Sequence, residues 1–202
     1  MLVARALTPD QLGSWALALA VQGYALHVGE FGLRSVVTTE AARAAVALPE
    51  LLRRYLRLRL ALTLVTVALV TLGAALLRPQ DALLIGLVTL SIVPIALQLD
   101  WLALVDDRAA LAAVLLLVQP LVFLALVGLY RSDLTPTFLA VCYLGSWALS
   151  ALASCTALRR TPVRHRGDLP TPSEMLRRGA ALALVTVTNQ AQLSADSAQA
   201  HR

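Results

Sequence analysis

Lysine is absent from this sequence, and all 17 of its basic residues are arginine. Charged residues of both signs make up only 14% of the chain, whereas hydrophobic residues make up 58%. The apolar stretches also lack the polar stripe at helical spacing that helices of a soluble bundle carry. The scarcity of charge therefore excludes most soluble functions, while we attribute the missing lysine to genome composition.

Cysteine and histidine are also scarce. The two cysteines, Cys142 and Cys155, lie on one expected helix, about 20 Å apart at about 1.5 Å per residue, which excludes a disulfide between them. The three histidines are scattered along the chain without the spacing of metal ligands. We therefore expect no metal site and no cofactor.

Catalytic motifs are missing as well. There is no glycine-rich phosphate loop, no His-Glu-x-x-His and no Gly-x-Ser-x-Gly elbow. The acidic pair Asp106-Asp107 would suit a metal-dependent prenyl or phosphoryl transferase, but such a pair beside an arginine is more often a solvated loop. We therefore expect a protein that is not an enzyme. The features of a cleavable signal peptide are also lacking.

What the sequence contains is five apolar stretches, at residues 12–28, 60–77, 82–99, 109–130 and 135–158. Each fits or approaches the roughly 17–25 residues that a helix needs to cross the hydrocarbon core. Pro94 and Pro120 are predicted to kink two of them. The fold class predicted is an all-α polytopic membrane helix bundle, with about five full transmembrane helices and a partial one at the C-terminus.

Arginine is concentrated on alternate connections between these stretches. Thirteen arginines lie in the loops after the first, third and fifth stretches, and three lie on the opposite side. Basic loops stay in the cytoplasm, so we expect a multi-pass membrane protein whose arginine-rich loops are cytoplasmic. The net charge of +5 is better explained by topology and by contact with anionic membrane lipid than by nucleic acid.

An acid and a base, Glu30 and Arg34, stand four residues apart at the cytoplasmic end of the first stretch. On a continuing helix this spacing puts them on one face. Two interpretations stay open: the pair marks a functional site at membrane depth, or the two side chains simply pair and reach the interface. Gly29 and Gly32 indicate a helix break or a close helix contact, and residues 35–48 are predicted to form a further helix.

Several short segments occur in an informative order. Residues 4–15 and Glu30-Phe31-Gly32-Leu33 flank the first stretch. Gln98-Leu99-Asp100-Trp101-Leu102 follows the third, with Arg108 and an apolar run after it. Arg177-Arg178-Gly179 precedes Asn189, Gln190 and Asp196. Together they resemble the start and end of the second helix, the Asp-Trp loop after the fourth, and the start of the seventh in bacterial O-antigen and polysaccharide flippases. Thr8 departs from the glycine usual in that family.

The resemblance covers only the N-terminal part of such flippases, which consist of two similar helix bundles. The expected organisation is a transmembrane bundle at residues 1–158, a basic cytoplasmic linker at 159–178 and the start of a truncated membrane helix at 179–202. The expected partner is a missing second bundle, without which we expect no transport.

The function that the resemblance implies is flipping a lipid-linked oligosaccharide, carried on a polyprenyl pyrophosphate, for polysaccharide or O-antigen biosynthesis. Arg34, with Arg57 or Arg59, would attract the pyrophosphate, although topology signalling is the simpler role for Arg57 and Arg59. Glu30 would hold Arg34 or respond to a coupling ion, and Gln22 would face a cavity or bond to a neighbouring helix.

Two other hypotheses about the function remain open. One is a related small-molecule antiporter, for which the acidic network expected inside the membrane is sparse. The other is an accessory or structural membrane protein, or a membrane enzyme.

Overall fold

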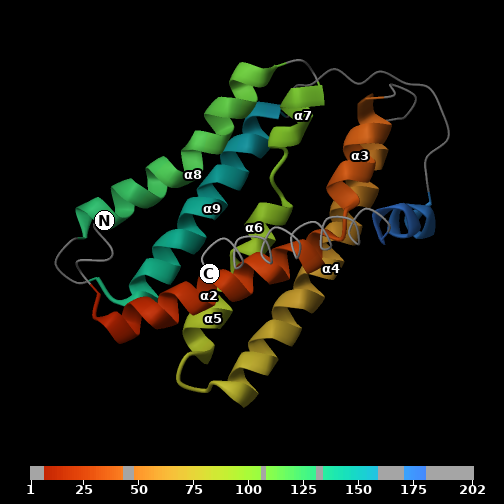
Figure 1. The fold of residues 1–202 in the computed structure, drawn as a ribbon. Helices are drawn as coiled ribbons and strands as arrows, with labels where there is room; N and C mark the ends of the chain where they lie inside the picture. The colour runs from red at the N-terminus through yellow and green to blue at the C-terminus, as the bar shows by residue number, and fades with distance from the viewer. Residues whose placement is uncertain (1–6, 43–47, 106–107, 131–133, 159–170, 181–202) are drawn as a thin grey trace, which may run out of the picture.

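The computed structural model describes residues 7–42, 48–105, 108–130, 134–158 and 171–180. Within these ranges the regular elements are α-helices, and there is no strand. In chain order the helices are α2 (Pro9–Glu30), α3 (Leu33–Ala42), α4 (Leu48–Leu77), α5 (Ala82–Leu90), α6 (Ile92–Ala96), α7 (Asp100–Val105), α8 (Ala109–Leu129) and α9 (Pro136–Leu158), followed by a helix at residues 172–180. Figure 1 shows α8 and α9 on one side of the bundle, α3 and α4 on the other, and α5 to α7 between them. The predicted all-α bundle is confirmed.

Four helices among the described residues are long and apolar enough to cross a membrane. They are Glu50–Leu77 in α4, Ala82–Leu104 through α5 to α7, Ala109–Leu129 in α8 and Pro136–Ala157 in α9. These four correspond to the second to fifth apolar stretches of the sequence. The first stretch lies in α2, which has 22 residues but is not among the four. By length and composition, these are the helices of a membrane-embedded protein.

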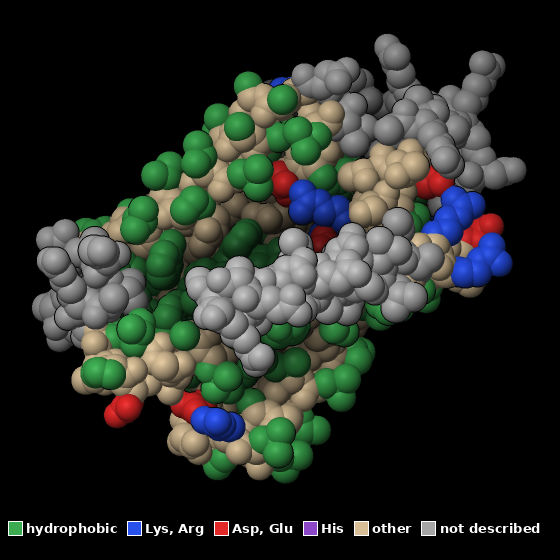
Figure 2. Space-filling model, viewed as in Figure 1, with side chains coloured by type: hydrophobic (Ala, Val, Ile, Leu, Met, Phe, Trp, Pro, Cys, Tyr) green, Lys and Arg blue, Asp and Glu red, His purple; other side chains and the backbone are tan. Residues whose placement is uncertain are grey.

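Leucines on the outer faces of α4 and α8 stay exposed. Leu64 and Leu69 on α4 are 55% and 64% exposed, and Leu117 and Leu121 on α8 are 56% and 61% exposed. Figure 2 shows hydrophobic side chains spread over the visible surface of the bundle. A soluble monomer rarely exposes so much contiguous apolar surface, whereas a bilayer covers it with lipid.

Local sequence determines both ends of α2. At its start, Thr8 Oγ1 accepts a hydrogen bond from the Gln11 N–H, and Gln11 Oε1 accepts one from the Thr8 N–H, with Pro9 in the first turn. At its end, Phe31 and Gly32 have φ angles of 43° and 67°. This left-handed conformation stops the helix and turns the chain into α3. The break that the sequence predicted therefore lies at Gly32.

Gly29 makes a close helix contact, which was the second interpretation of the two glycines. A Cβ atom at this position would lie 3.5 Å from Thr63 Cα, so α2 and α4 approach each other closely here. The helix predicted at residues 35–48 is present as α3 up to Ala42, and residues 43–47 lie outside the described part of the chain.

The span Ala82–Leu104 is not one continuous helix. Residues 97–99, between α6 and α7, are not helical. A second interruption falls at Ser91, between α5 and α6, and Pro94, a predicted kink site, follows it in the first turn of α6. Proline removes a backbone donor and disfavours a continuous helix. Pro120, by contrast, lies inside α8, which continues past it.

Buried apolar side chains form two clusters. The cluster between α3, α4 and α7, called the upper cluster here, includes Leu33, Leu51, Tyr55, Trp101 and Met175. The second cluster joins α2, α5 and α9 and includes Trp15, Ala18, Ile85, Val88 and Leu139. The upper cluster lies directly beside the charged residues described below.

The helix at residues 172–180 begins with a capping box. Thr171 Oγ1 accepts a hydrogen bond from the Glu174 N–H at 3.3 Å, and a Glu174 carboxylate oxygen accepts one from the Thr171 N–H at 3.1 Å. The bond from the Thr171 N–H holds the pKa of the Glu174 carboxyl below its ordinary value. The helix begins inside the range 159–178 that was predicted to be a linker, so the end of that range is helical. Residues 159–170 and 181–202 lie outside the described part.

Three contacts fasten this helix to the bundle. Met175 is fully buried in the upper cluster. The Arg178 guanidinium lies 2.7 Å from a carboxylate oxygen of Glu40 on α3. Gly179 lies against the turn between α2 and α3, where a Cβ atom would be 2.6 Å from the Phe31 carbonyl oxygen. The helix therefore packs against the turn that joins Glu30 to Arg34.

Candidate functional site

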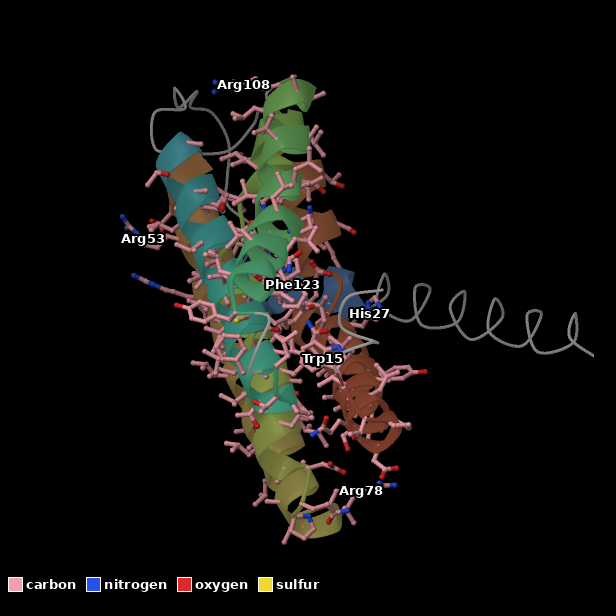
Figure 3. All side chains as sticks on the ribbon, turned by 90° about the vertical axis from the view of Figure 1, so that its left-hand side faces the viewer. Trp15, His27, Arg53, Arg78, Arg108 and Phe123 are labelled. Carbon is pink, nitrogen blue, oxygen red and sulfur yellow. The ribbon has the colours of Figure 1, made fainter. Side chains whose placement is uncertain are left out.

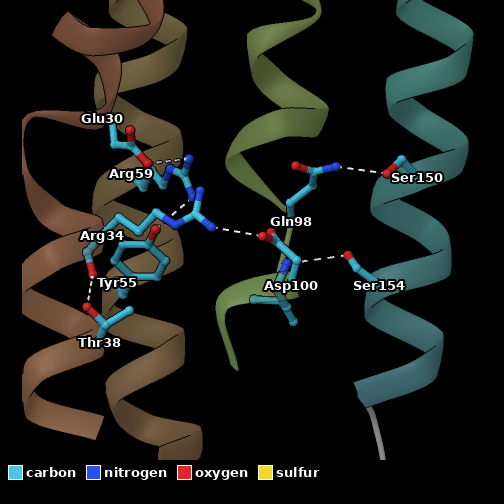
Figure 4. A network of polar contacts seen from close by, with 10 residues as sticks. Glu30, Arg34, Thr38, Tyr55, Arg59, Gln98, Asp100, Ser150 and Ser154 are labelled. Atoms are coloured by element: carbon cyan, nitrogen blue, oxygen red, sulfur yellow. Dashed lines mark hydrogen bonds and ion pairs between the residues drawn. The ribbon is translucent and has the colours of Figure 1, made fainter. Parts of the chain in front are cut away.

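Arg59 lies on α4 at the edge of its apolar part, with its side chain only 3% exposed. Its guanidinium donates to Tyr55 Oη at 2.7 Å and to Glu30 Oε1 at 3.1 Å. The guanidinium carbon also lies 5.6 Å from the centre of the Tyr55 ring. A buried charge needs such partners, because removing one partner of a buried pair costs about 3–5 kcal/mol. These three side chains tie the end of α2 to α4 (Figure 4).

A second ion pair joins Arg34 in the first turn of α3 to Asp100 at the start of α7. Arg34 Nη2 lies 2.8 Å from Asp100 Oδ2. The two partners differ in exposure, since the Arg34 side chain is 41% exposed and that of Asp100 is 5% exposed. The second carboxylate oxygen of Asp100 is buried and has no hydrogen-bond partner among the described residues. Asp100 is thus a buried anion that depends on one half-exposed cation.

Glu30 and Arg34 do not pair with each other, so the expectation that Glu30 holds Arg34 is wrong. Because α2 ends at the left-handed Phe31–Gly32 turn, the four-residue spacing no longer places the two side chains on one helical face. Each instead pairs with a residue far along the chain: Glu30 with Arg59, 29 positions away, and Arg34 with Asp100, 66 positions away.

Buried serines on α9 hold the non-helical segment before Asp100. Ser150 Oγ accepts a hydrogen bond from Gln98 Nε2 at 2.9 Å, and Ser154 Oγ accepts one from the Leu99 N–H at 3.3 Å. Both serines are 1% exposed. Backbone groups released from a helix at membrane depth must find partners inside the protein. Ser154 provides one for the Leu99 N–H, while Ser150 holds the Gln98 side chain. As a result, the start of α7 is anchored to α9 (Figure 4).

Sequence reasoning missed these serines, although a signal was present. Ser146, Ser150 and Ser154 recur at intervals of four residues on an otherwise apolar stretch, which is the spacing of one helical face. The first member, Ser146, accepts a hydrogen bond from Gln119 of α8 at 3.2 Å. Tyr55 was missed too, because an aromatic residue four positions before an arginine is not by itself a distinctive pattern.

The structure places the other predicted site residues in different surroundings. Trp101 is buried and packs edge-on against Tyr55, with ring centres 5.8 Å apart. Gln22 is buried in α2 and donates to Ser91 Oγ at 3.5 Å, so it bonds to a neighbouring segment. Arg57 and Arg108 are exposed. The residues brought together are Glu30, Arg34, Arg59, Asp100 and Trp101, and those left apart are Gln22, Arg57 and Arg108.

The face between α2 and the α8–α9 pair is hollowed (Figure 2). Hydrophobic side chains line the visible floor of this hollow, and acidic and basic side chains lie at its edge. Figure 3 shows Arg108 and Arg78 at opposite ends of the bundle. Chemically, the charged residues provide a half-exposed guanidinium that can bind an anion. No group of three or more His, Cys, Asp or Glu residues able to hold a metal ion occurs in the described part of the chain.

Comparison of the chain with protein-family models, with curated proteins and with solved structures found no match. The resemblance to flippases therefore rests on the sequence segments alone.

Proposed function

We propose that this chain forms a helix bundle of a membrane transporter that binds the pyrophosphate of a polyprenyl-linked oligosaccharide and helps to flip it across the bilayer. The observation that supports this function is the state of Arg34. Its side chain is 41% exposed on α3, beside the four candidate spans, and among the described residues it is tied to one carboxylate, that of Asp100 inside the span Ala82–Leu104. Ionisable side chains in such bundles are costly and commonly mark a substrate path.

The chemistry of the ligand fits this guanidinium. A glycan and a pyrophosphate cannot enter hydrocarbon unaided, because desolvating polar and charged groups without partners is expensive. A planar guanidinium donates two parallel hydrogen bonds to phosphate oxygens, which a lysine cannot do in the same geometry. The apolar outer faces of α4 and α8 would meanwhile remain in contact with lipid.

Arg59 and Arg57 have different roles in this proposal. Arg59 already satisfies Glu30 and Tyr55 and is nearly inaccessible, so it maintains the structure around the site. Arg57 is exposed on α4 and contributes to topology and to contact with lipid headgroups. Arg34 is therefore the residue assigned to the pyrophosphate.

The proposal includes a location and an orientation. The bundle would lie in a bacterial inner membrane, with the arginine-rich connections on the cytoplasmic side. Arg108 would then face the cytoplasm, and Arg78 at the opposite end would face outward (Figure 3). The ligand would be loaded from the cytoplasmic leaflet.

Binding of farnesyl pyrophosphate to the chain in nanodiscs of zwitterionic lipid tests the role of Arg34. We expect Arg34→Ala to weaken binding roughly 10- to 100-fold, because a hydrogen bond to a charged group contributes about 1.5–3 kcal/mol. Arg53→Ala is the matched control, since Arg53 is exposed and pairs only weakly with Glu50 on the surface of α4.

Two further ligands separate headgroup recognition from other binding. Farnesol, which lacks the pyrophosphate, should bind equally to the wild type and to Arg34→Ala, whereas inorganic pyrophosphate should show the same dependence on Arg34 with lower affinity. Equal losses in the Arg34 and Arg53 variants, or no loss in either, would contradict the proposed function.

A further inference from the structure

We infer that Asp100 is a built-in competitor for the anionic ligand: it occupies Arg34 in the empty site and recovers Arg34 when the ligand leaves. This inference rests on the proposed function, because it concerns the same guanidinium. It assigns to Asp100 the control of ligand affinity and release.

The geometry makes Arg34 the movable member of the pair. Its side chain is long and 41% exposed, and among the described residues one ion pair, 2.8 Å from Nη2 to Asp100 Oδ2, ties it to α7. Asp100 is 5% exposed and directly follows the segment that Ser150 and Ser154 anchor to α9. An arriving phosphate can therefore draw Arg34 away, while Asp100 stays where it is.

Losing Arg34 leaves Asp100 in an unfavourable state. One of its carboxylate oxygens already lacks a hydrogen-bond partner among the described residues, and the other would lose the guanidinium. A buried carboxylate without partners is strongly disfavoured. This penalty lowers the net affinity for the ligand and favours its release, which a transporter requires as much as it requires binding.

The neighbouring Arg59–Glu30 pair shows the arrangement of an arginine that a ligand does not draw away from its carboxylate. Arg59 is itself the buried member, 3% exposed, and it holds Tyr55 as well as Glu30. A ligand that reached Arg59 would have to break both contacts. The asymmetry of burial therefore assigns exchange to the Arg34–Asp100 pair.

The test is the affinity of Asp100→Asn for farnesyl pyrophosphate in zwitterionic nanodiscs. We expect binding to be roughly tenfold tighter than in the wild type, a typical size for coupling between two interactions in a protein. The matched control is Asp81→Asn, which makes the same change in net charge. Asp81 accepts a hydrogen bond from Ser14 at 2.9 Å in the α4–α5 turn, at the opposite end of the bundle (Figure 1). The control should leave the affinity unchanged.

The double variant Arg34→Ala/Asp100→Asn separates competition from a general charge effect. Neutralising Asp100 should give no tightening when Arg34 is absent. Unchanged or weaker binding in Asp100→Asn, or equal tightening in Asp81→Asn, would overturn the inference. If Arg34→Ala alone weakens binding while Asp100→Asn does not tighten it, the proposed function survives and only this inference fails. If Arg34→Ala has no effect, both fail.

A second neutral variant and a wild-type measurement cover the case in which Asp100→Asn does not fold. Asp100→Ser also removes the charge and should show the same tightening. In the wild type, solid-state NMR can follow the dipolar coupling between aspartate carboxyl carbons and arginine guanidinium nitrogens. Adding farnesyl pyrophosphate should remove one coupling, and Arg34→Ala should lack that coupling from the start. A coupling that persists with ligand bound would overturn the inference.

Discussion

At the scale of single residues, Arg59 shows how the bundle accommodates a charge that water hardly reaches. The carboxylate of Glu30 balances its charge, while the hydroxyl and ring of Tyr55 fill the rest of its surroundings. Glu30 is held less firmly than Arg59, because its side chain is 24% exposed and Glu30 is the last residue of α2. Replacing Glu30 alone therefore leaves the buried Arg59 cation without its counter-ion, whereas replacing both residues leaves no buried charge.

The Glu30→Gln substitution tests this account of Arg59. We expect it to lower the free energy of unfolding by about 1–2 kcal/mol, less than the roughly 3–5 kcal/mol of a fully buried pair, because water screens the exposed part of Glu30. Denaturant titration of the chain in detergent, followed by circular dichroism, measures the change.

Glu50→Gln is the control for the Glu30 variant. Glu50 lies 3.2 Å from both Arg53 and Arg54 and is 37% exposed, so this pairing on the surface of α4 should contribute at most about 1 kcal/mol. The double variant Glu30→Gln/Arg59→Leu should recover part of the loss. Equal losses in the Glu30 and Glu50 variants would show that Arg59 does not depend on Glu30.

At the scale of elements, the helix at residues 172–180 packs against the α2–α3 turn because residue 179 is a glycine and has no side chain. Gly179→Ala would place a methyl carbon 2.6 Å from the Phe31 carbonyl oxygen, a backbone atom in a turn that leaves little room for adjustment. We expect the helix to separate from the α2–α3 turn. Hydrogen exchange of residues 172–180 should then become faster than in the wild type.

Gly145→Ala is the control for this prediction. Apart from its chain neighbours and the backbone of its own helix, no heavy atom of the described residues lies within 4 Å of a Cβ atom built at Gly145 in α9. Alanine favours a helix over glycine by up to about 1 kcal/mol, so this control should be neutral or stabilising. If the two alanine variants behave alike, the contact between Gly179 and Phe31 does not hold the helix in place.

Most helix bounds could be predicted from the sequence because they follow apolar runs. The stretches expected at 109–130 and 135–158 match Ala109–Leu129 and Pro136–Leu158 closely. By contrast, α4 starts at Leu48, well before the apolar run that begins at residue 60. Its first turns carry arginines, so the apolar pattern does not indicate this part of the helix. The third span continues past the break at residues 97–99 to Leu104, and Ser154 of α9 accepts a hydrogen bond from the Leu99 N–H released there.

The candidate site was harder to predict than the helices. Glu30 and Arg34 could be identified because charges are rare near apolar stretches. Arg59 and Asp100 were singled out as well, but their pairing with Glu30 and Arg34 could not be predicted, because it depends on the packing of helices distant in the sequence. The break at Gly32 was indicated, but its effect on pairing depends on the three-dimensional turn.

At the scale of the whole molecule, the distribution of arginine predicts an orientation. In a chain whose native cysteines are replaced by serine, Arg108→Cys and Gln80→Cys place single thiols at exposed positions. Gln80 is two residues from Arg78, which lies at the opposite end of the bundle from Arg108 (Figure 3). We expect a membrane-impermeant maleimide, applied to intact spheroplasts, to label Gln80→Cys at once and Arg108→Cys only after permeabilisation. The reverse pattern would mean that the arginine-rich connections lie outside.

The order of the ion-pair partners along the chain has a consequence for biogenesis. In both pairs the more exposed member comes first: Glu30 before Arg59, and Arg34 before Asp100. During synthesis from the N-terminus, each deeply buried charge therefore enters the membrane after its counter-ion has already been made. Neither Arg59 nor Asp100 has to wait in the translocon or the lipid for a partner that does not yet exist.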